Sequence, residues 1–422
     1  MYFESRDKFN IINRKYIYFL IIAITPTLVI GPAIPDIIVS YLAFICIIHL
    51  CLNKINIFKN KLIILFFLFY LILLLSSFLS DYYQFSFRSS SVYFRFILFS
   101  VLVFLVYEKY PKIIYWCSIV AFITILIVVF DAIFQYIFSY NTIGYERAHA
   151  TRVSGFFYDK YVLGSFIVRI MPISLIFLFF NNNQYNNLKY KSLILLYFII
   201  IALGIFLSGE RTAIVYFLII LILSFLFLNY LRKFFISFFI IFISLSISIF
   251  YYDEDIKSRF LNTTISELGL NDNTLSIKIF SDTHQKFYYT SFLIFKDNVF
   301  FGAGPNTYRK KCKDKIYKFT DTDENKIINT CATHPHNTYM QLLAEAGIIS
   351  FLIIIFLFIL ILYKLINLLI NSSSSRNNDI IQFLLLVACF VTLFPFVPNG
   401  NFFNNWLNIL YFLPVGFLLK KI

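Results

Sequence analysis

The amino-acid sequence predicts an all-α polytopic membrane protein with about twelve transmembrane helices and one large loop outside the membrane. Of its 422 residues, 60% are hydrophobic and only 14% are charged, whereas soluble domains are nearer half apolar and a quarter charged. The apolar residues form unbroken runs long enough to cross about 30 Å of hydrocarbon as helices. Because the backbone in lipid must satisfy its own hydrogen bonds, such runs indicate helices rather than barrel strands.

The expected spans cover residues 16–31, 34–52, 61–79, 92–107, 112–138, 160–180, 191–207, 212–229, 234–251, 338–363, 380–397 and 404–419. They divide the chain into a bundle at 1–251 with spans one to nine, a loop or cap at 252–335, and a second bundle part at 336–422 with spans ten to twelve. The first run follows charged residues and lacks a small-residue cleavage site, so we expect it to remain as a helix.

The distribution of Lys and Arg predicts the orientation of the chain. Basic residues accumulate in short cytoplasmic loops, and here they gather in the N-terminal segment and in alternate connections, for example at Lys54, Lys59 and Lys61. We therefore expect both termini in the cytoplasm and the 252–335 loop between spans nine and ten on the outer face. The same bias explains most of the net charge of +14, so nucleic acid is not expected as a partner.

The outer loop contains one segment with a clear helical pattern. Residues 284–299 carry apolar side chains at helical spacing, which predicts an amphipathic helix. Gly302, Gly304 and Pro305 follow this segment and are typical of a helix end. The loop is too short for an elaborate independent domain, and we expect it to lie as a helical cap on the outer mouth of the bundle.

In this orientation, the polar residues that are unusual for a membrane protein fall on one face of the membrane. They are Arg147, His149, Arg152, Ser208, Gly209, Glu210, Arg211, His284, Arg309, His334, His336 and Asn337. A transporter or flippase would instead carry polar residues through the middle of the membrane, with broken helices and internal repeats. The crowding at one rim favours an enzyme, and a polysaccharide transporter is the alternative from a different class.

A histidine segment, residues 333–339, opens a very apolar helix. Asn337 or Thr338 can cap that helix. A helix N-terminus favours a phosphate or a developing anion, and the imidazoles of His334 and His336 can exchange protons near neutral pH. The simpler interpretation is a capped helix whose histidines only hydrogen-bond the loop. Two histidines without a clear third or fourth ligand do not predict a metal site.

Arg211 follows a tight turn at Gly209, where a guanidinium can fork onto phosphate oxygens at the membrane surface. Its simpler role is a structural pair with Glu210 or a contact with a lipid headgroup, and Arg152 has the same two interpretations. The basic run at 309–318 either holds an anionic ligand or forms a solvated or lipid-facing surface.

Two further pairs of residues carry structural expectations. Arg169 and Asp131 both fall near mid-membrane, where a lone charge costs roughly 2.5–3.5 kcal/mol on insertion scales, so we expect them to pair. Cys312 and Cys331 are two of six cysteines and both lie in the outer loop. In an oxidising compartment they can close a disulfide loop of about twenty residues; otherwise they are free thiols.

Four segments together resemble the O-antigen ligase and O-antigen polymerase superfamily of bacterial inner-membrane proteins. In chain order they are RVSGFFYDKYVLGS (152–165), the Ser-x-x-Arg turn (208–211), FKDNVFFGAGPNTYR (295–309) and HPHNTYMQLLAEAGIISF (334–351). The resemblance covers roughly residues 130–355. Many relatives have an arginine where His284 stands here, and Arg309 is the candidate to replace it.

The resemblance implies a glycosyltransferase that takes a glycan from undecaprenyl diphosphate on the periplasmic face of the bacterial inner membrane. It implies catalytic roles for His336 and Arg211, and substrate contacts from Arg152, Arg309, His334, Asn337, Tyr339 and His284. No cofactor or metal is expected, because arginines can stabilise the charge that develops. The expected partners are the glycan donor, a lipid A-core or glycan acceptor, and membrane lipids.

The sequence does not name the acceptor. The first interpretation is an O-antigen ligase that attaches polysaccharide to the lipid A-core. A repeat-unit polymerase and a protein O-oligosaccharyltransferase are the alternatives, because each would use the same donor and the same pattern of histidine and arginine.

Overall fold

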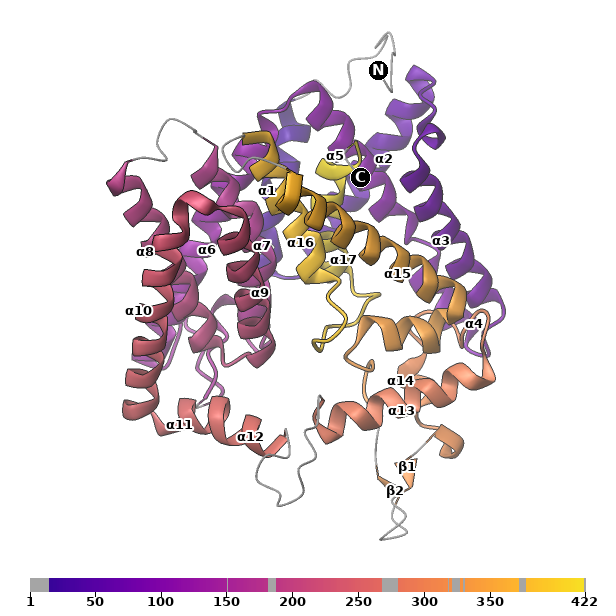
Figure 1. Cartoon of the computed structure of the whole chain (residues 1–422). Helices are drawn as coiled ribbons and strands as arrows, with labels where there is room; N and C mark the ends of the chain where they lie inside the picture. The colour runs from indigo at the N-terminus through magenta and orange to yellow at the C-terminus, as the bar shows by residue number, and fades with distance from the viewer. Residues whose placement is uncertain are drawn as a thin grey trace.

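The computed structural model of the chain describes residues 15–149, 151–180, 187–267, 280–317, 319–320, 327–328, 331–371 and 377–420. These residues form a bundle of α-helices, with short elements gathered at one end of it (Figure 1). We call that end the cap end.

The bundle helices are α1 (Lys15–Ile30), α2 (Ala33–Asn53), α3 (Lys61–Phe78), α5 (Phe94–Lys109), α6 (Ile113–Phe138), α7 (Leu163–Phe179), α8 (Leu188–Ser208), α9 (Arg211–Phe227), α10 (Arg232–Tyr252), α15 (Thr338–Asn371), α16 (Asn377–Thr392) and α17 (Asn405–Leu418). Short helices at 57–59 and 229–231 join α2 to α3 and α9 to α10.

The elements at the cap end are α4 (Tyr83–Ser90), a 3-10 turn (Gly155–Phe157), α11 (Glu254–Lys257), a π-helical turn (Ser258–Asn262), α12 (Thr263–Glu267), α13 (Asp282–Asp297), α14 (Tyr308–Lys311), a 3-10 turn (Lys315–Tyr317), and an antiparallel pair of two-residue strands, β1 (Phe319–Thr320) and β2 (Ile327–Ile328). The predicted amphipathic helix is α13, which packs on α15.

Each predicted span falls on one bundle helix. Among the described residues, seven helical segments are long and apolar enough to cross a membrane by length and composition, and they contain α2, α3, α5, α6, α8, α10 and α15. The other five helices, α1, α7, α9, α16 and α17, are apolar but shorter. The chain is therefore an α-helical, multi-pass membrane protein. The exact number of twelve crossings and the side on which the cap lies stay predictions.

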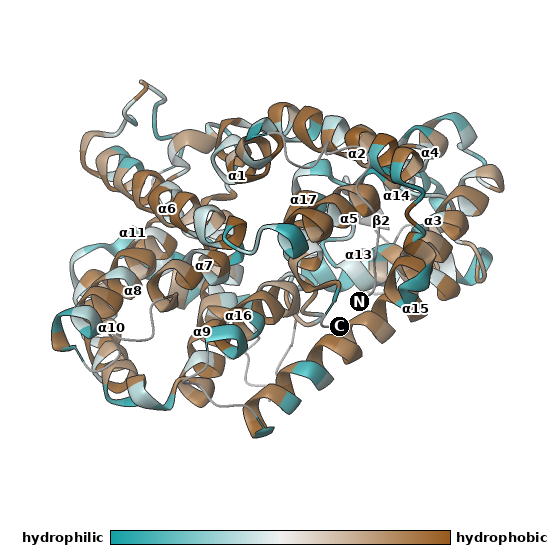
Figure 2. Ribbon diagram, turned by 90° about the horizontal axis from the view of Figure 1, so that it is seen from above, coloured by the Kyte–Doolittle hydropathy of each residue, from teal (hydrophilic) through white to brown (hydrophobic). Residues whose placement is uncertain are grey.

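The bundle helices are apolar along most of their length (Figure 2), and many apolar side chains of the outer helices are exposed. In α10, for example, Ile240 and Ile247 are each 65% exposed, while only Phe235 and Phe238 are buried. Contact of such an apolar surface with lipid costs little free energy, whereas its exposure to water is unfavourable. The centre of the bundle is formed by α5, α7, α16 and α17, in which most side chains are buried.

The span predicted at 380–397 continues beyond the actual helix, because α16 ends at Thr392. Two prolines, Pro395 and Pro398, follow that end, and proline cannot continue a regular helix. Residues 393–404 instead form an inner loop between α16 and α17, in which Asn399 is buried. Irregular backbone of this kind is tolerated inside a membrane protein where the protein itself surrounds it.

The cap is locked to α15 at two glycines. Helix α15 is kinked at Gly347, whose φ is 73° and ψ is −177°. There, the backbone of 344–348 is joined to that of 299–304 by three hydrogen bonds of 2.9 Å. A Cβ on Gly302 would overlap the backbone at 345–347, and a Cβ on Gly347 would overlap the carbonyl of Phe300. Both glycines are therefore required for the close approach.

We expect Gly347→Ala to lower the free energy of unfolding by roughly 1–3 kcal/mol, because alanine is strained at positive φ and its methyl group meets backbone that cannot move aside. Thermal unfolding of the detergent-solubilised protein measures this. Gly400→Ala is the matched control, since its added Cβ would meet only Leu407 Cδ2, at 3.7 Å. Equal unfolding temperatures for the two variants would contradict the requirement for glycine at the contact between the cap and α15.

Candidate functional site

Three imidazole rings meet at the cap end. The ring of His336 lies 4.1 Å from that of His334 and 5.7 Å from that of His284, measured between centroids. The ring of Phe287 stacks on His336, also at 5.7 Å. His284 and Phe287 belong to α13, whereas His334 and His336 precede α15. The cap helix and the entry to a bundle helix therefore build this cluster together.

Burial determines the protonation of the cluster. It lowers the pKa of His336 to about 4, with repulsion from His284 as the second cause. It lowers the pKa of His334 to about 3, with repulsion from His336 as the second cause. The pKa of His284 is also lowered by burial, against the attraction of Glu267. All three imidazoles are thus mainly neutral near pH 7 and able to accept a proton.

The backbone of His336 is in the left-handed region, with φ at 57°. Few residues other than glycine adopt this conformation, although histidine is among those enriched in it. The carbonyl oxygen of His336 accepts a hydrogen bond of 2.8 Å from the backbone N–H of Asn399 in the inner loop. That bond fixes the turn in which His336 is presented.

Asn337 caps α15, which was one of the two predicted caps. Its Oδ1 accepts hydrogen bonds from the backbone N–H groups of Tyr339 and Met340, at 2.9 and 3.1 Å. Its Nδ2 donates to the carbonyl of Pro395 at 2.8 Å, and the hydroxyl of Tyr339 donates to the carbonyl of Leu393 at 2.7 Å. The side chains of Asn337 and Tyr339 therefore tie the histidine segment to the inner loop.

Three guanidinium groups converge on the turn between α8 and α9. Arg152 donates from Nε to the carbonyl of Ser208 at 3.4 Å, and Arg259 donates from Nε to the carbonyl of Gly209 at 3.3 Å. Arg211 begins α9 and binds Glu267 through both of its terminal nitrogens, at 2.9 Å each. The turn thus collects cations from the loop before α7, from α9 and from the cap.

The charges of this arginine cluster repel one another. Burial lowers the pKa of Arg259, and the nearby Arg152 and Arg211 lower it further. Burial likewise lowers the pKa of Arg152, which also stacks on the ring of Tyr161 at 4.3 Å. Glu267 is the carboxylate bound to one of these three guanidiniums. Guanidiniums are donors of the kind that bind multiply charged anions such as phosphates.

The structural pair between Arg211 and Glu210, one of the alternatives for Arg211, is not the arrangement found. Glu210 accepts hydrogen bonds from the backbone N–H groups of Gly164 and Ser165, at 2.7 and 3.2 Å, and from the hydroxyl of Ser165 at 2.6 Å. It thereby satisfies the free N–H groups at the start of α7. Burial raises the pKa of Glu210, and these hydrogen bonds oppose that rise. Arg211 is left to pair with the cap.

The arginine cluster and the histidine cluster are electrostatic neighbours. Arg211 and Glu267 both act on the protonation of His284, and His284 in turn acts on His336. A charged group bound at the arginines would therefore change the pKa values of the imidazoles. Sequence analysis identified Arg152, Arg211, His284 and His336 but missed Arg259, which lies in the cap shortly after the predicted ninth span. The sequence signal for Arg259 was its position a few residues after the predicted span 234–251, which places it near the membrane surface.

Arg309 is a further cation near the histidine segment, where its charge helps to lower the pKa of His334. Its NH2 donates to Oδ1 of Asn306 at 2.9 Å, and its Nε is buried without a hydrogen-bond partner among the described residues. Two other basic residues of the 309–318 run contact side chains of the protein itself. Lys310 lies over the ring of Phe85, and Lys311 pairs with Asp81; residue 318 falls outside the described residues.

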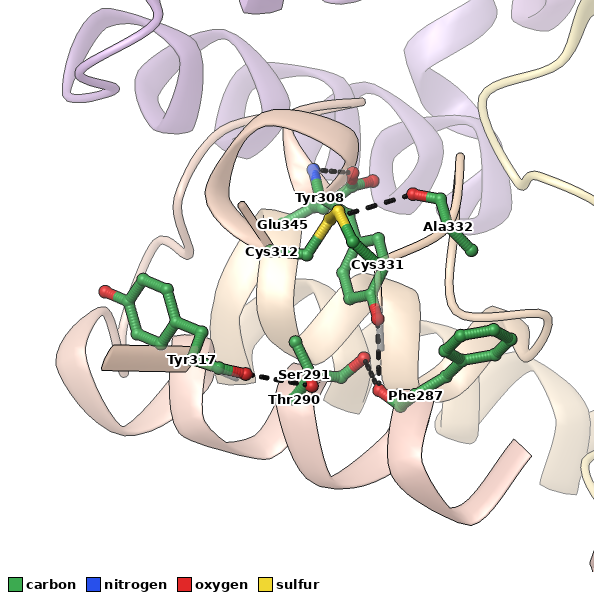
Figure 3. Close-up of a disulfide and its surroundings, with 9 residues drawn as sticks. All are labelled: Phe287, Thr290, Ser291, Tyr308, Cys312, Tyr317, Cys331, Ala332 and Glu345. Atoms are coloured by element: carbon green, nitrogen blue, oxygen red, sulfur yellow. Dashed lines mark hydrogen bonds between the residues drawn. A yellow bond between two sulfur atoms is a disulfide. The ribbon is translucent and has the colours of Figure 1, made fainter. Parts of the chain in front are cut away.

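A disulfide anchors the chain just before the histidine segment. It joins Cys312, at the end of α14, to Cys331, with the two Cα atoms 5.1 Å apart (Figure 3). Cys312 is fully buried with Tyr308, whose backbone N–H donates to the Glu345 carboxylate at 2.6 Å. Glu345 belongs to α15, so the bridge fastens the approach to His334 onto the same helix that the segment opens.

The pair expected between Asp131 and Arg169 is not formed, and that prediction was wrong. The connection after α6 folds back, so that Thr142 donates to Oδ1 of Asp131 from its backbone N–H at 2.9 Å and from its hydroxyl. Arg169 donates to the carbonyl of Ser165 at 3.0 Å and to Oδ1 of Asn399 at 2.8 Å. Two loops that enter the bundle supply neutral hydrogen-bond partners to Asp131 and Arg169. The hydropathy of the sequence does not show that these loops fold inward.

Among the described residues, no group of three or more His, Cys, Asp and Glu side chains is placed to hold a metal ion. Metal independence stays an expectation. The polar atoms of the site come instead from guanidiniums, imidazoles and backbone N–H groups, which suit an anion and a proton transfer.

The fold and this site define a multi-pass membrane protein with a cationic, histidine-containing site at one end of its bundle. Residues 196–355 match the family model described as O-Antigen ligase. The match is consistent with the O-antigen ligase superfamily, which the sequence resembles, and it suggests a glycosyltransferase of the O-antigen ligase or polymerase type. The matched range includes Arg211, Arg259, His284, Arg309 and His336. A search among curated proteins found no match to the chain.

Proposed function

We propose that the protein transfers a glycan from undecaprenyl diphosphate to the lipid A-core on the periplasmic face of the bacterial inner membrane, as an O-antigen ligase. The observation that supports this best is the arginine cluster of Arg152, Arg211 and Arg259 next to the neutral imidazoles of His284 and His336. The first cluster suits a diphosphate, and the second suits the hydroxyl that attacks the sugar.

In the proposed reaction, an acceptor hydroxyl oxygen bonds to the anomeric carbon of the donor glycan. The bond between that carbon and the diphosphate oxygen breaks, and its electron pair leaves on the lipid diphosphate. The guanidiniums of Arg211, Arg152 and Arg259 stabilise this negative charge. The imidazole of His336 accepts the hydroxyl proton as general base. Atoms and charge balance without a cofactor or a nucleotide.

The low pKa of His336 fits this order of events. An imidazole with a pKa of about 4 is a weak base before the donor binds. A diphosphate held by the neighbouring arginines favours the protonated form and so raises the pKa of His336 towards the working pH. Donor binding would thus make the base stronger at the moment when it is needed.

Two other acceptors use the same site. A repeat-unit polymerase would transfer the glycan to a second carrier-linked glycan, and a protein O-oligosaccharyltransferase would transfer it to a Ser or Thr hydroxyl. Neither changes the roles of Arg211 and His336. A flippase is disfavoured, because the guanidiniums and imidazoles of the site gather at one end of the bundle rather than along its length.

The test is deletion of the gene followed by gel analysis of lipopolysaccharide and of carrier-linked glycan. For a ligase, the deletion strain loses all polymer on the core and accumulates it on the carrier. For a polymerase, one repeat unit remains on the core. Unchanged lipopolysaccharide, together with no transfer by purified protein in nanodiscs supplied with donor and core acceptor, would contradict both.

The pH dependence of transfer follows from the lowered pKa of His336. The base must be neutral to work, and a pKa of about 4 in the free enzyme keeps it neutral down to that pH. We expect kcat/KM for the donor to show no loss attributable to histidine between pH 8 and 5, and a decline only as the pH falls further. A histidine at its usual pKa would give an inflection near 6.5. Initial rates over this range, with enzyme stability checked at each pH, decide between the two.

A further inference from the structure

Arg169 is a buried cation whose hydrogen-bond partners are neutral. It lies in α7 and is 4% exposed. Its NH1 donates to the carbonyl of Ser165 at 3.0 Å, its NH2 donates to Oδ1 of Asn399 at 2.8 Å, and its guanidinium lies 5.1 Å from the ring centroid of Tyr216. Burying such a charge beside neutral groups is unfavourable in a membrane protein and often marks a functional residue.

Asn399 is the hub to which this charge connects. Its side-chain Nδ2 donates to the hydroxyls of Thr338 and Tyr411 at 3.2 Å each, and to the carbonyl of Thr392 at 3.1 Å. Its backbone N–H holds the carbonyl of His336 at 2.8 Å. The inner loop is thereby fastened to both sides of the histidine segment.

Arg169 is the charged member of the groups that determine which way the Asn399 amide faces. The backbone N–H of Gly400 also donates to Oδ1, at 2.8 Å, and the Thr392 carbonyl accepts from Nδ2. An amide can be rotated so that its oxygen and nitrogen exchange places, and only its neighbours decide between the two orientations. A guanidinium donates and never accepts, so it requires Oδ1 on its own side. The Nδ2 donors are then directed at Thr338 and Tyr411. A charge-assisted hydrogen bond is roughly twice as strong as a neutral one, which makes this choice firm.

The turn at His336 needs such support. Its φ of 57° is unfavourable for a side chain with a Cβ and persists where surrounding contacts determine it. The bond from Asn399 to the His336 carbonyl and the bond from Asn399 to Thr338 hold the residues on either side of Asn337. A shift of about 1 Å in a reacting group can cost about 100-fold in rate.

We propose that Arg169 and Asn399 are positioning residues: Arg169 strengthens the orientation of the Asn399 amide that Gly400 and Thr392 also favour, and Asn399 holds His336 in the left-handed turn that presents its imidazole. The inference rests on the proposed function of His336. Neither residue touches the arginine cluster that would bind the diphosphate, and both lie outside the range matched by the family.

The first variant is Arg169→Met, which keeps the length of the side chain and removes the donors. Turnover of purified protein in nanodiscs is expected to fall roughly 10- to 100-fold, with the KM for the donor within about twofold of wild type, since the guanidiniums at the α8–α9 turn are unchanged. Arg169→Lys, which still donates to Asn399, should recover part of the turnover. Ser174→Ala is the control: Ser174 is buried in the same helix and bonds Tyr197 instead.

The decisive measurement is a double-mutant cycle with His336→Asn. If Arg169 acts through His336, then Arg169→Met causes no further loss of single-turnover rate in that background. If Arg169 only stabilises the bundle, the same fold loss appears in both backgrounds, and the inference is overturned.

Asn399→Asp covers the case in which Arg169→Met does not accumulate. Its carboxylate keeps the acceptor for Arg169 but loses the Nδ2 donors, so we expect normal abundance and a loss of turnover similar to that of Arg169→Met. Full turnover in Asn399→Asp would overturn the inference. Absence of transfer by the wild-type protein would instead contradict the proposed function, so the two failures are distinguishable.

Discussion

His336→Asn is expected to accumulate like the wild-type protein and to lose about 100-fold or more of its transfer rate, the usual contribution of a general base. Asparagine tolerates the left-handed conformation that His336 adopts, so the turn and its bond to Asn399 can persist. The amide, however, cannot take up a proton as the imidazole does. Initial rates with purified protein, normalised to folded protein, measure the effect.

His149→Asn is the control for this variant. His149 is also a histidine of the cap end, but it is exposed and bonds Thr151 in its own loop. It should keep wild-type turnover. If His336→Asn also keeps it, His336 is not the base, and the neighbouring His334 and His284 become the groups to replace.

Arg211→Gln is expected to lower kcat by about 100- to 1,000-fold, the range seen when one donor to a developing negative charge is removed. Glutamine keeps a hydrogen-bond donor but loses the charge and the fork that a diphosphate would use. Single-turnover rates with a polyprenyl-diphosphate donor report this directly. Arg88→Gln, at an exposed arginine of α4, should leave the rate unchanged.

The variant Glu267→Gln distinguishes a structural role of Arg211 from a catalytic one. In the structure, Arg211 is held by the Glu267 carboxylate. Glu267→Gln removes that ion pair and leaves the guanidinium in place. If Arg211 serves to bind phosphate, Glu267→Gln should stay within a few-fold of wild type. A loss as large as that of Arg211→Gln would mean that the ion pair itself is what the protein needs.

Hydropathy was sufficient to predict the helical bundle, because lipid imposes one rule on every residue that faces it. The predicted spans at 112–138 and 191–207, for example, fall on α6 and α8. It was not sufficient where a loop enters the bundle. The inner loop at 393–404 shortens α16 and gives Arg169 a neutral partner, and periodicity contains no sign of that folding.

The candidate site shows the same division. The cap on α15 was predictable, because Asn337 directly precedes an apolar helix and N-capping is a local interaction. The positions of Arg259 and Glu267 were not predictable, because the path of the cap brings Arg259 to Gly209 and Glu267 to Arg211, and no local pattern specifies that path. Two of the segments that resemble the family, 295–309 and 334–351, meet in space because Gly302 and Gly347 let the cap and α15 come into backbone contact.

The bridge between Cys312 and Cys331 makes the intervening stretch topologically separate from the site. Its Cα atoms are 5.1 Å apart, so the chain departs and returns at nearly one point. The number of residues in between therefore does not set the distance from α14 to His334. Tyr317 is buried against α13 and must be kept. An epitope or fluorescent label inserted between β1 and β2 should be tolerated without moving the histidines, which offers a way to follow the protein in living cells.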